Sequence, residues 1–280
     1  MKKIKRALIS VSNKKKLGPL LRVLKKNFVE IISSGGTYKE IKKLKYNCID
    51  ISKYTGSPEI LGGRVKTLHP KIHAGILNKR NNKSHLQELI KNNFKNIDLV
   101  IVNFYPFEET LKNTSKHERI IENIDIGGPT MVRSAAKNYN DVTVITSTNQ
   151  YDELVNEMTK HKGKTSLKFR EKMSQIAFTE TAHYDSLISE YFNKITNNFF
   201  PNKKIIYGNL IEKLRYGENP HQESAIYSKN KSLSILQLHG KKLSYNNYND
   251  KQLGFAQLHG KELSYNNYND MFASLDILES

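Results

Sequence analysis

The chain has 280 residues and carries 45 Lys and Arg against 27 Asp and Glu, a formal net charge of +18. Its length fits one large or two ordinary domains, and no apolar run reaches the ~18 residues of a membrane span. The start, MKKIKRALISVS, lacks a signal-peptide cleavage pattern and predicts a first strand instead. The single cysteine, Cys48, excludes an intrachain disulfide framework and favours a reducing cytosol, so we expect a cytoplasmic protein.

The positive charge has two readings. It could attract an anionic partner, or it could reflect a Lys-rich composition spread over solvated faces. No basic cluster is interleaved with aromatic residues as a nucleic-acid groove requires, which favours the solvated faces. We therefore expect neither a nucleic-acid nor a membrane partner, although the charge would still help to attract a phosphate group.

The first 51 residues predict alternating strands and helices. Strands are expected at 4–11, 28–32 and 47–51, with helices at 14–27 and 38–45 between them. This order is typical of a parallel sheet with helices on both faces, the open α/β class.

A Gly- and Pro-rich segment at 52–70 shows little periodicity and predicts a long loop, which in a compact domain is often functional. Further elements follow it in chain order. They are helix 83–94, strand 97–104, helix 116–124, a Gly-Gly-Pro turn entering another helix, strand 142–146, and helices 149–161 and 166–195.

The helical pattern breaks at 197–204, so we place a domain boundary there and expect domains at 1–198 and 199–280. Within the second, residues 257–270 repeat residues 237–250 with a single change, at a period of 20. Two copies are too few for a repeat architecture. They indicate a recent duplication or a fault of sequence assembly.

Small polar and basic residues follow the predicted strands. Because parallel strands end at one edge of a sheet, and helix N-termini with glycines bind anions, the sequence predicts a phosphate site there. Ordinary capping of helices by Ser and Thr is the alternative. The residues concerned are Ser10, Ser12 and Lys14, then Ser34, Gly35, Gly36 and Thr37, then Asn103 and Tyr105, with the loop residues Arg64, Lys66 and Thr67 beside them.

Two further patterns remain open. Asp125 precedes Gly127 and Gly128 and could act as a functional carboxylate or merely cap the following helix, which also carries Lys137. His69 and His73 have an i, i+4 spacing that could suggest a metal site. Pro70 lies between them and no third ligand accompanies them, so we predict no metal.

An ordered set of motifs resembles a known family. The set comprises SVSNK at 10–14, SGGT at 34–37, GSPEILGGRVKTLHPKIHAGIL at 56–77, NFYPF at 103–107, DIGG at 125–128, AAKN at 135–138 and LRYGENPHQ at 214–222. Together these are similar to the bifunctional purine-biosynthesis family that joins IMP cyclohydrolase to AICAR transformylase, and the match covers nearly all of residues 4–250. The resemblance implies a methylglyoxal-synthase-like first domain.

The resemblance also implies chemistry. The first domain would close the ring of the ribonucleotide FAICAR to give IMP, without metal or cofactor. The implied catalytic set is Lys66, Tyr105, Asp125 and Lys137. Lys66 or Lys137 would stabilise the oxyanion, and Asp125 would orient the attacking amide. The implied substrate-binding set is Ser10, Ser12, Lys14, Ser34, Gly35, Gly36, Thr37, Arg64, Thr67, Asn103, Gly127 and Gly128.

The residues from 199 onward resemble only the opening of an α/β transformylase domain, in which Arg215 and Tyr216 match substrate-binding positions. The segment with that domain's catalytic Lys-His pair has no counterpart, so we expect no transformylase activity and no use of 10-formyltetrahydrofolate. Family members are homodimers, which makes a homodimer a candidate state. Three alternatives stay open: a methylglyoxal-synthase-like lyase, a non-catalytic nucleotide-binding remnant and a basic nucleic-acid binder.

Overall fold

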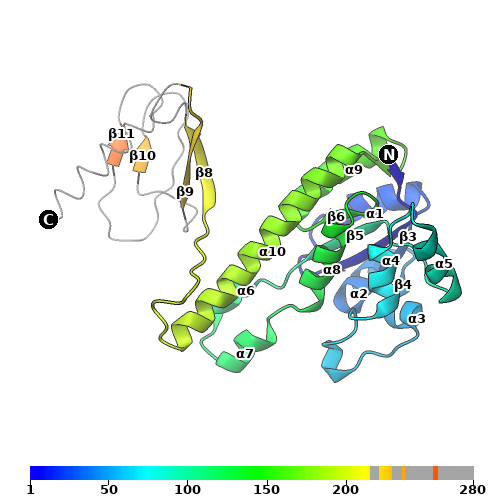
Figure 1. Ribbon diagram of the computed structural model, residues 1–280, viewed down its shortest axis with the longest axis horizontal. Coiled ribbons are helices and arrows are strands. Elements are labelled where there is room, and N and C mark those ends of the chain that lie inside the picture. Colours follow the sequence, from blue (N-terminus) through cyan, green and yellow to red (C-terminus); the bar gives the residue numbers. More distant parts are fainter. Residues whose placement is uncertain (215–220, 229–234, 238–254, 258–280) are drawn as a thin grey trace. The chain divides into compact units, whose positions relative to one another are not determined.

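A computed structural model describes residues 1–214, 221–228, 235–237 and 255–257 (Figure 1). The chain divides into two compact units, Met1–Phe199 and Phe200–Ser280. Arg215, Tyr216 and nearly all of the repeated segment lie outside the described residues.

The first unit is built on a five-stranded, entirely parallel sheet in the order β4-β3-β2-β5-β6, which confirms the predicted open α/β class. The strands at its centre are buried on both faces, so they read as near-continuous apolar runs rather than as alternating ones. A short antiparallel pair, β1 with β7, lies beside this sheet. The strands are β1 (Lys2–Lys3), β2 (Arg6–Val11), β3 (Glu30–Ser33), β4 (Ile49–Asp50), β5 (Leu99–Asn103), β6 (Thr143–Ile145) and β7 (Lys164–Thr165).

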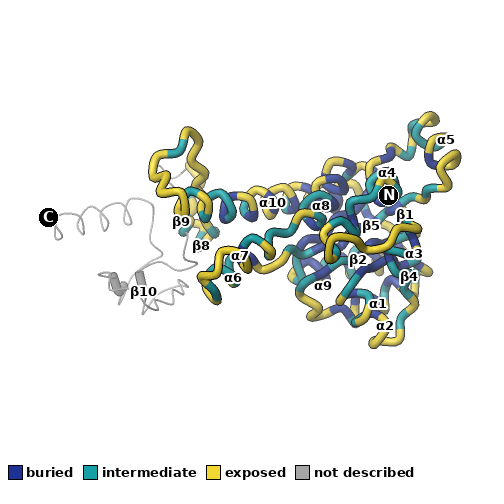
Figure 2. Tube along the Cα trace, turned by 90° about the horizontal axis from the view of Figure 1, so that it is seen from below, coloured by how far each residue is buried: buried dark blue, intermediate teal, exposed yellow. Residues whose placement is uncertain are grey.

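Helices cover both faces of the sheet (Figures 1 and 2). Helices α1, α2 and α9 lie on one side, and α4, α8 and α10 lie on the other, where α8 packs against β5 and α10 against β6. The helices are α1 (Leu17–Lys26), α2 (Gly35–Lys43), α3 (Ile51–Thr55), α4 (Pro70–Leu77), α5 (Lys83–Lys91), α6 (Phe107–Asn113), α7 (His117–Glu122), α8 (Gly127–Lys137), α9 (Tyr151–Lys160) and α10 (Leu167–Ile195), with single 3₁₀ turns at Leu61–Gly63 and Thr148–Gln150.

The structure corrects three sequence predictions. The segment 52–70 is not one loop, because α3 and a 3₁₀ turn interrupt it, and α4 begins at Pro70 with His69 as its cap. Helix α6 was not anticipated. Phe28, expected in a strand, has a φ of 57° and is 94% exposed. It turns the chain after α1, and the strand begins at Glu30.

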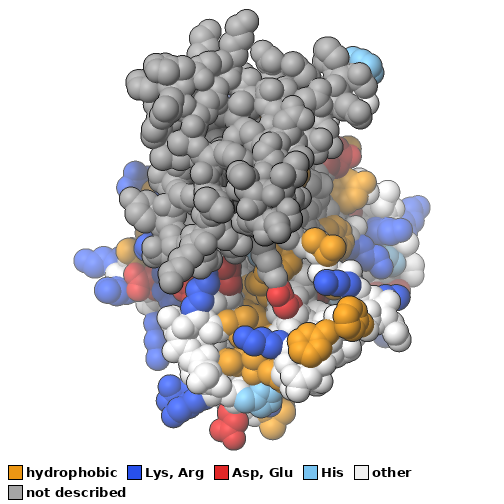
Figure 3. All heavy atoms as spheres, turned by 90° about the vertical axis from the view of Figure 1, so that its left-hand side faces the viewer, with side chains coloured by type: hydrophobic (Ala, Val, Ile, Leu, Met, Phe, Trp, Pro, Cys, Tyr) orange, Lys and Arg blue, Asp and Glu red, His pale blue; other side chains and the backbone are white. Residues whose placement is uncertain are grey.

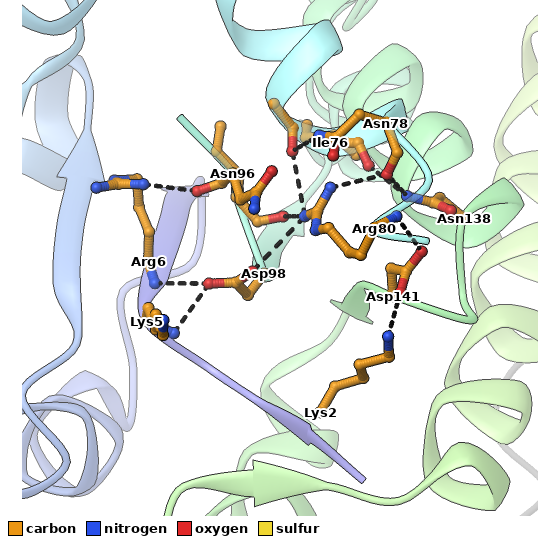
Figure 4. Close-up of polar contacts among 12 residues, drawn as sticks. Lys2, Lys5, Arg6, Ile76, Asn78, Arg80, Asn96, Asp98, Asn138 and Asp141 are labelled. Carbon is orange, nitrogen blue, oxygen red and sulfur yellow. Dashed lines mark hydrogen bonds and ion pairs between the residues drawn. The ribbon is translucent and has the colours of Figure 1, made fainter. Parts of the chain in front are cut away.

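The amino-terminal edge of the sheet is tied together by a part-buried polar network (Figure 4). The Arg80 guanidinium donates to the Ile97 carbonyl at 2.8 Å and lies 3.6 Å from an Asp98 carboxylate oxygen. The Arg80 amide donates to Asp141 at 3.0 Å, and Lys2 pairs with the same carboxylate at 2.6 Å. Burial lowers the pKa of Arg80 while the two carboxylates oppose that shift. The network anchors the chain between α4 and α5, away from the strand ends that carry the predicted site.

In the second unit, β8 (Asn209–Leu214) pairs antiparallel with β9 (Ser224–Ser228) through an irregular register near Leu210, and β10 (Ile235–Gln237) pairs parallel with β11 (Phe255–Gln257).

Across the described part of the chain, no helix has the length and apolar character needed to cross a bilayer. Among the coloured side chains visible in Figure 3, Lys and Arg are interspersed with apolar and uncharged residues instead of forming one continuous patch.

Candidate functional site

A cleft of about 520 Å³ opens at the carboxyl edge of the sheet in the first unit. It gathers residues from the carboxyl ends of β2 and β5, the N-terminus of α2, the loop before α4, the end of α7 and the N-terminus of α8. Fourteen of the residues expected from the sequence line it: Ser10, Ser12, Lys14, Ser34, Gly36, Thr37, Arg64, Lys66, Thr67, Asn103, Tyr105, Asp125, Gly127 and Gly128.

One end of the cleft is cationic. A methyl group placed on Gly35 would lie 2.9 Å from Lys66 Nζ, and one on Gly36 would lie 3.4 Å from Lys14 Cε. Two lysine side chains therefore approach the first turn of α2, where free backbone N–H groups point outward. Ser34 caps this helix in an extended conformation without a side-chain capping bond. Amides, a hydroxyl and two ammonium groups together suit a phosphate dianion.

Two polar residues of the cleft hold its walls together. Asn103 Oδ1 accepts hydrogen bonds from the Ser12 hydroxyl and from the Asn13 amide, both at 2.9 Å. The Thr37 hydroxyl donates to the Val11 carbonyl and accepts from the Val11 amide, also both at 2.9 Å. Since Thr37 is buried and its proton is used within the chain, its contribution is to fix α2 against β2.

Asp125 and Tyr105 line the cleft together, next to the N-terminus of α8. Asp125 Oδ1 accepts the Gly128 amide at 2.8 Å, so the carboxylate does cap α8 while it also faces the cleft. Burial raises the pKa of Asp125, although hydrogen bonds from the Gly128 and Tyr105 amides pull it down. Burial also raises the pKa of Tyr105, and the charges of Asp125 and Glu59 add to that effect. The Tyr105 hydroxyl is therefore protonated at neutral pH and can donate a hydrogen bond.

The two glycines that open α8 permit close packing. A methyl group on Gly127 would lie 2.2 Å from Thr67 Oγ1, and one on Gly128 would lie 2.4 Å from Asp125 Oδ2. Real Cβ atoms do not approach other atoms so closely, so larger residues would push the loop and the carboxylate away. Glycine at both positions brings Thr67 and Asp125 onto the helix terminus.

Both loop cations have carboxylate partners that sequence reasoning missed. Lys66 Nζ lies 3.5 Å from Glu59 on the same loop, and Arg64 forms a bidentate, exposed pair with Glu122 at the end of α7. Glu122 lines the cleft. Glu122 is 58 residues from Arg64 in the chain, so no sequence pattern predicts the pair. Glu59, in contrast, lies in the same GSPEILGGRVKTLHP motif as Lys66.

Sequence reasoning also missed an apolar wall of the cleft, which consists of Ile121, Ile124, Ile126 and Met131. Such a wall is suited to pack against the face of a flat heterocycle. One buried tyrosine that does not line the cleft was missed as well. The tyrosine is Tyr184 of α10, whose hydroxyl bonds to the Asp125 amide at 2.8 Å.

The structure does not bring Lys137 into this cleft. Lys137 is exposed at the last residue of α8, about 15 Å along the helix axis from Gly127. Gly35 does not line the cleft either, but it is in close contact with the Lys66 side chain, which does.

The two histidines have local structural partners. His69 Nδ1 accepts the Lys71 amide at 3.1 Å, and His73 Nδ1 lies 3.2 Å from the Ser134 hydroxyl. Within the described residues, no group of three or more His, Cys, Asp or Glu could hold a metal ion.

Comparisons with known proteins agree with the fold. The MGS-like domain model matches residues 16–130, and the AICARFT/IMPCHase bienzyme model matches residues 135–256. The crystal structure of ForH superimposes with a TM-score of 0.60 and 29% identity, over 68% of this chain and 99% of that one. The first unit is thus an MGS-like α/β domain.

Curated relatives identify the family. The bifunctional purine biosynthesis protein PurH of Elusimicrobium minutum is 47% identical over 252 residues, which are 89% of this chain and 48% of the relative. PurH of Limosilactobacillus reuteri is 49% identical over 253 residues, 88% of this chain and 49% of the relative. The chain belongs to the PurH family and spans about half the length of the curated relatives it matches.

Proposed function

We propose that the first unit is an IMP cyclohydrolase that closes FAICAR to IMP with loss of water. The observation that carries the proposal is the cleft itself. It combines a cationic helix terminus, a part-buried carboxylate and a protonated tyrosine around one cavity. The substrate has the matching polarity, with a phosphate at one end and a carboxamide and a formamide on its imidazole.

In this proposal the phosphate binds at the N-terminus of α2, with Lys14 beside it and the Ser34 hydroxyl as a further donor. The helix N-terminus and an ammonium group both favour a dianion. The imidazole then extends along the apolar wall toward Asp125. Binding at both ends holds the carboxamide nitrogen near the formyl carbon, and such orientation can supply a large part of the rate acceleration.

Ring closure needs a better nucleophile and a stabilised oxyanion. The Asp125 carboxylate is suited to accept a carboxamide N–H proton, and its raised pKa brings it closer to the working pH. The Tyr105 hydroxyl and the Lys66 ammonium are suited to donate to the developing oxyanion and then to the departing water. Lys137 lies outside the cleft of a single chain, so its implied catalytic role stays a prediction.

The test is the absorbance change on mixing the 280-residue chain with FAICAR, which reports IMP. Lys66→Gln should lower kcat/KM by about 100-fold or more, because an oxyanion-stabilising donor is lost. Lys39→Gln makes the same charge change on an exposed residue of α2 outside the cleft and should leave turnover intact. No IMP formation by the unaltered chain would refute the proposal.

A non-catalytic nucleotide-binding remnant is the second candidate, because the cationic end alone would hold a nucleotide phosphate. IMP would then protect the chain against thermal unfolding, without turnover of FAICAR.

Four further expectations stay predictions for this chain. They are the lack of formyl transfer from 10-formyltetrahydrofolate to AICAR, cyclisation without metal or cofactor, a cytoplasmic location and a homodimer. Adding a chelator to the FAICAR assay tests the metal prediction.

A further inference from the structure

Tyr184 joins the long helix α10 to the segment that carries Asp125. Its hydroxyl accepts the Asp125 amide at 2.8 Å and donates to the Asn123 carbonyl at 3.3 Å, across 59 and 61 residues of sequence. The residue is only 6% exposed. One buried hydroxyl therefore holds two backbone groups of the turn between α7 and α8.

The ring of Tyr184 contacts a second segment of the cleft. Its centroid lies 5.0 Å from that of Phe104 and 6.1 Å from that of Phe107. These two residues flank Tyr105 in the chain, so the same side chain packs behind both proposed polar groups of the reacting end. Burial raises the pKa of Tyr184 to about 12, so the hydroxyl keeps its proton and remains a donor at neutral pH.

We propose that Tyr184 is a positioning residue that sets how Asp125 and Tyr105 lie beside each other in the cleft. The inference rests on the proposed cyclohydrolase function and extends it to a residue on α10. Tyr184 does not line the cleft, so it acts through the two segments that it holds. A displacement of about 1 Å of a reacting group can cost on the order of 100-fold in rate.

Tyr191 provides a matched control on the same helix. Its hydroxyl bonds to His117 Nδ1 at 2.7 Å, and its ring lies 6.1 Å from that of Phe107 in an edge-on geometry. It thus shares the ring packing and a side-chain hydrogen bond with Tyr184. Its hydrogen bond reaches the start of α7 rather than the Asp125 turn.

The test compares Tyr184→Phe with Tyr191→Phe in the full chain. Tyr184→Phe keeps the ring but loses both backbone bonds, so kcat should fall about 10- to 100-fold while KM stays within about threefold of the unaltered value. Tyr191→Phe should leave both constants unchanged. A purely structural role would instead lower the thermal stability of Tyr184→Phe and leave its kcat equal to that of Tyr191→Phe.

Hydrogen exchange supplies a readout that does not need turnover. The peptide spanning residues 123–128 should exchange faster in Tyr184→Phe and at the unaltered rate in Tyr191→Phe. Equal exchange in the two variants, or an unchanged kcat in Tyr184→Phe, would overturn the inference. If the unaltered chain fails to cyclise FAICAR, the proposed function and the kinetic role of Tyr184 both fall. The exchange result would then report only whether Tyr184 orders the turn.

Discussion

The Thr37 hydroxyl closes a two-way hydrogen bond with the backbone of Val11, donating to its carbonyl and accepting from its amide at 2.9 Å each. This pair joins the end of β2 to the first turn of α2, which is the cationic end of the cleft. Thr37→Val keeps the side-chain shape but leaves both buried backbone groups unpaired. We expect it to lower the free energy of unfolding by about 1–3 kcal/mol and to raise KM for FAICAR, as measured by chemical denaturation and initial rates.

Thr37→Ser is the matched control for that prediction. It retains the hydroxyl and removes only a methyl group, so it should keep most of the stability and nearly the original KM. If Thr37→Val weakened neither stability nor substrate binding, the two bonds to Val11 would not hold the cleft in shape.

The close approach of Thr67 to Gly127 gives a second prediction. Gly127→Ala would bring a methyl group to 2.2 Å from Thr67 Oγ1, so we expect a loss of about 1–3 kcal/mol of stability from overpacking together with a fall in activity. Thr67→Ala removes the clashing oxygen. The double variant Gly127→Ala/Thr67→Ala should therefore be more stable than the sum of the single changes predicts, in thermal denaturation. Additive losses would mean that the two residues do not meet.

The sheet could be predicted from the sequence because its signal is local. A strand buried on both faces needs a nearly unbroken apolar run, and the runs at 4–11 and 97–104 have no competing helical pattern. Parallel pairing then places the strand ends together, which is why the residues around Ser12, Thr37 and Tyr105 could be grouped in advance. The fold therefore accounts for most of the candidate cleft.

The remaining features depend on tertiary contacts that leave no local pattern. Tyr184 lies in a long helix in which it resembles any other core aromatic, and only the folded chain brings it to Asp125. Glu122 reads as an ordinary charged residue until α7 places it opposite Arg64. Phe28 misled the strand prediction because the turn after α1 exposes it, and periodicity carries no information about such a reversal.

The exposed pair of Arg64 with Glu122 predicts that the Glu122 carboxylate and the substrate phosphate compete for the Arg64 guanidinium. Arg64 lines the cleft, yet its guanidinium is engaged by Glu122, whose pKa that contact lowers. Glu122→Gln should weaken the pairing and lower KM for FAICAR severalfold, with kcat and thermal stability unchanged because exposed ion pairs contribute little to folding. Glu118→Gln makes the same change on the exposed face of α7 and should leave KM as it is. A raised KM in Glu122→Gln would instead show that the pair holds Arg64 in its binding position.

The raised pKa of Asp125 predicts opposite effects of one substitution on stability and on activity. Burial favours the neutral carboxyl in the folded state, so ionising Asp125 costs folding free energy, and its stabilising effect is lost as pH rises through the folded-state pKa. Asp125→Asn carries no such penalty, and its amide oxygen can still accept the Gly128 amide. The variant should therefore have a higher Tm than the unaltered chain at neutral pH, with a kcat lower by about 100-fold or more.

The difference in Tm should shrink as pH falls toward about 4, where an ordinary carboxyl becomes protonated and the two chains carry the same charge at this site. Asp152→Asn is the control, because that carboxylate is 69% exposed on α9 and has little desolvation to relieve. Its effect on Tm should be small over the same pH range. A Tm gap for Asp125→Asn that stays constant from neutral to acid pH would show that the gain comes from packing or hydrogen bonding and not from the buried charge.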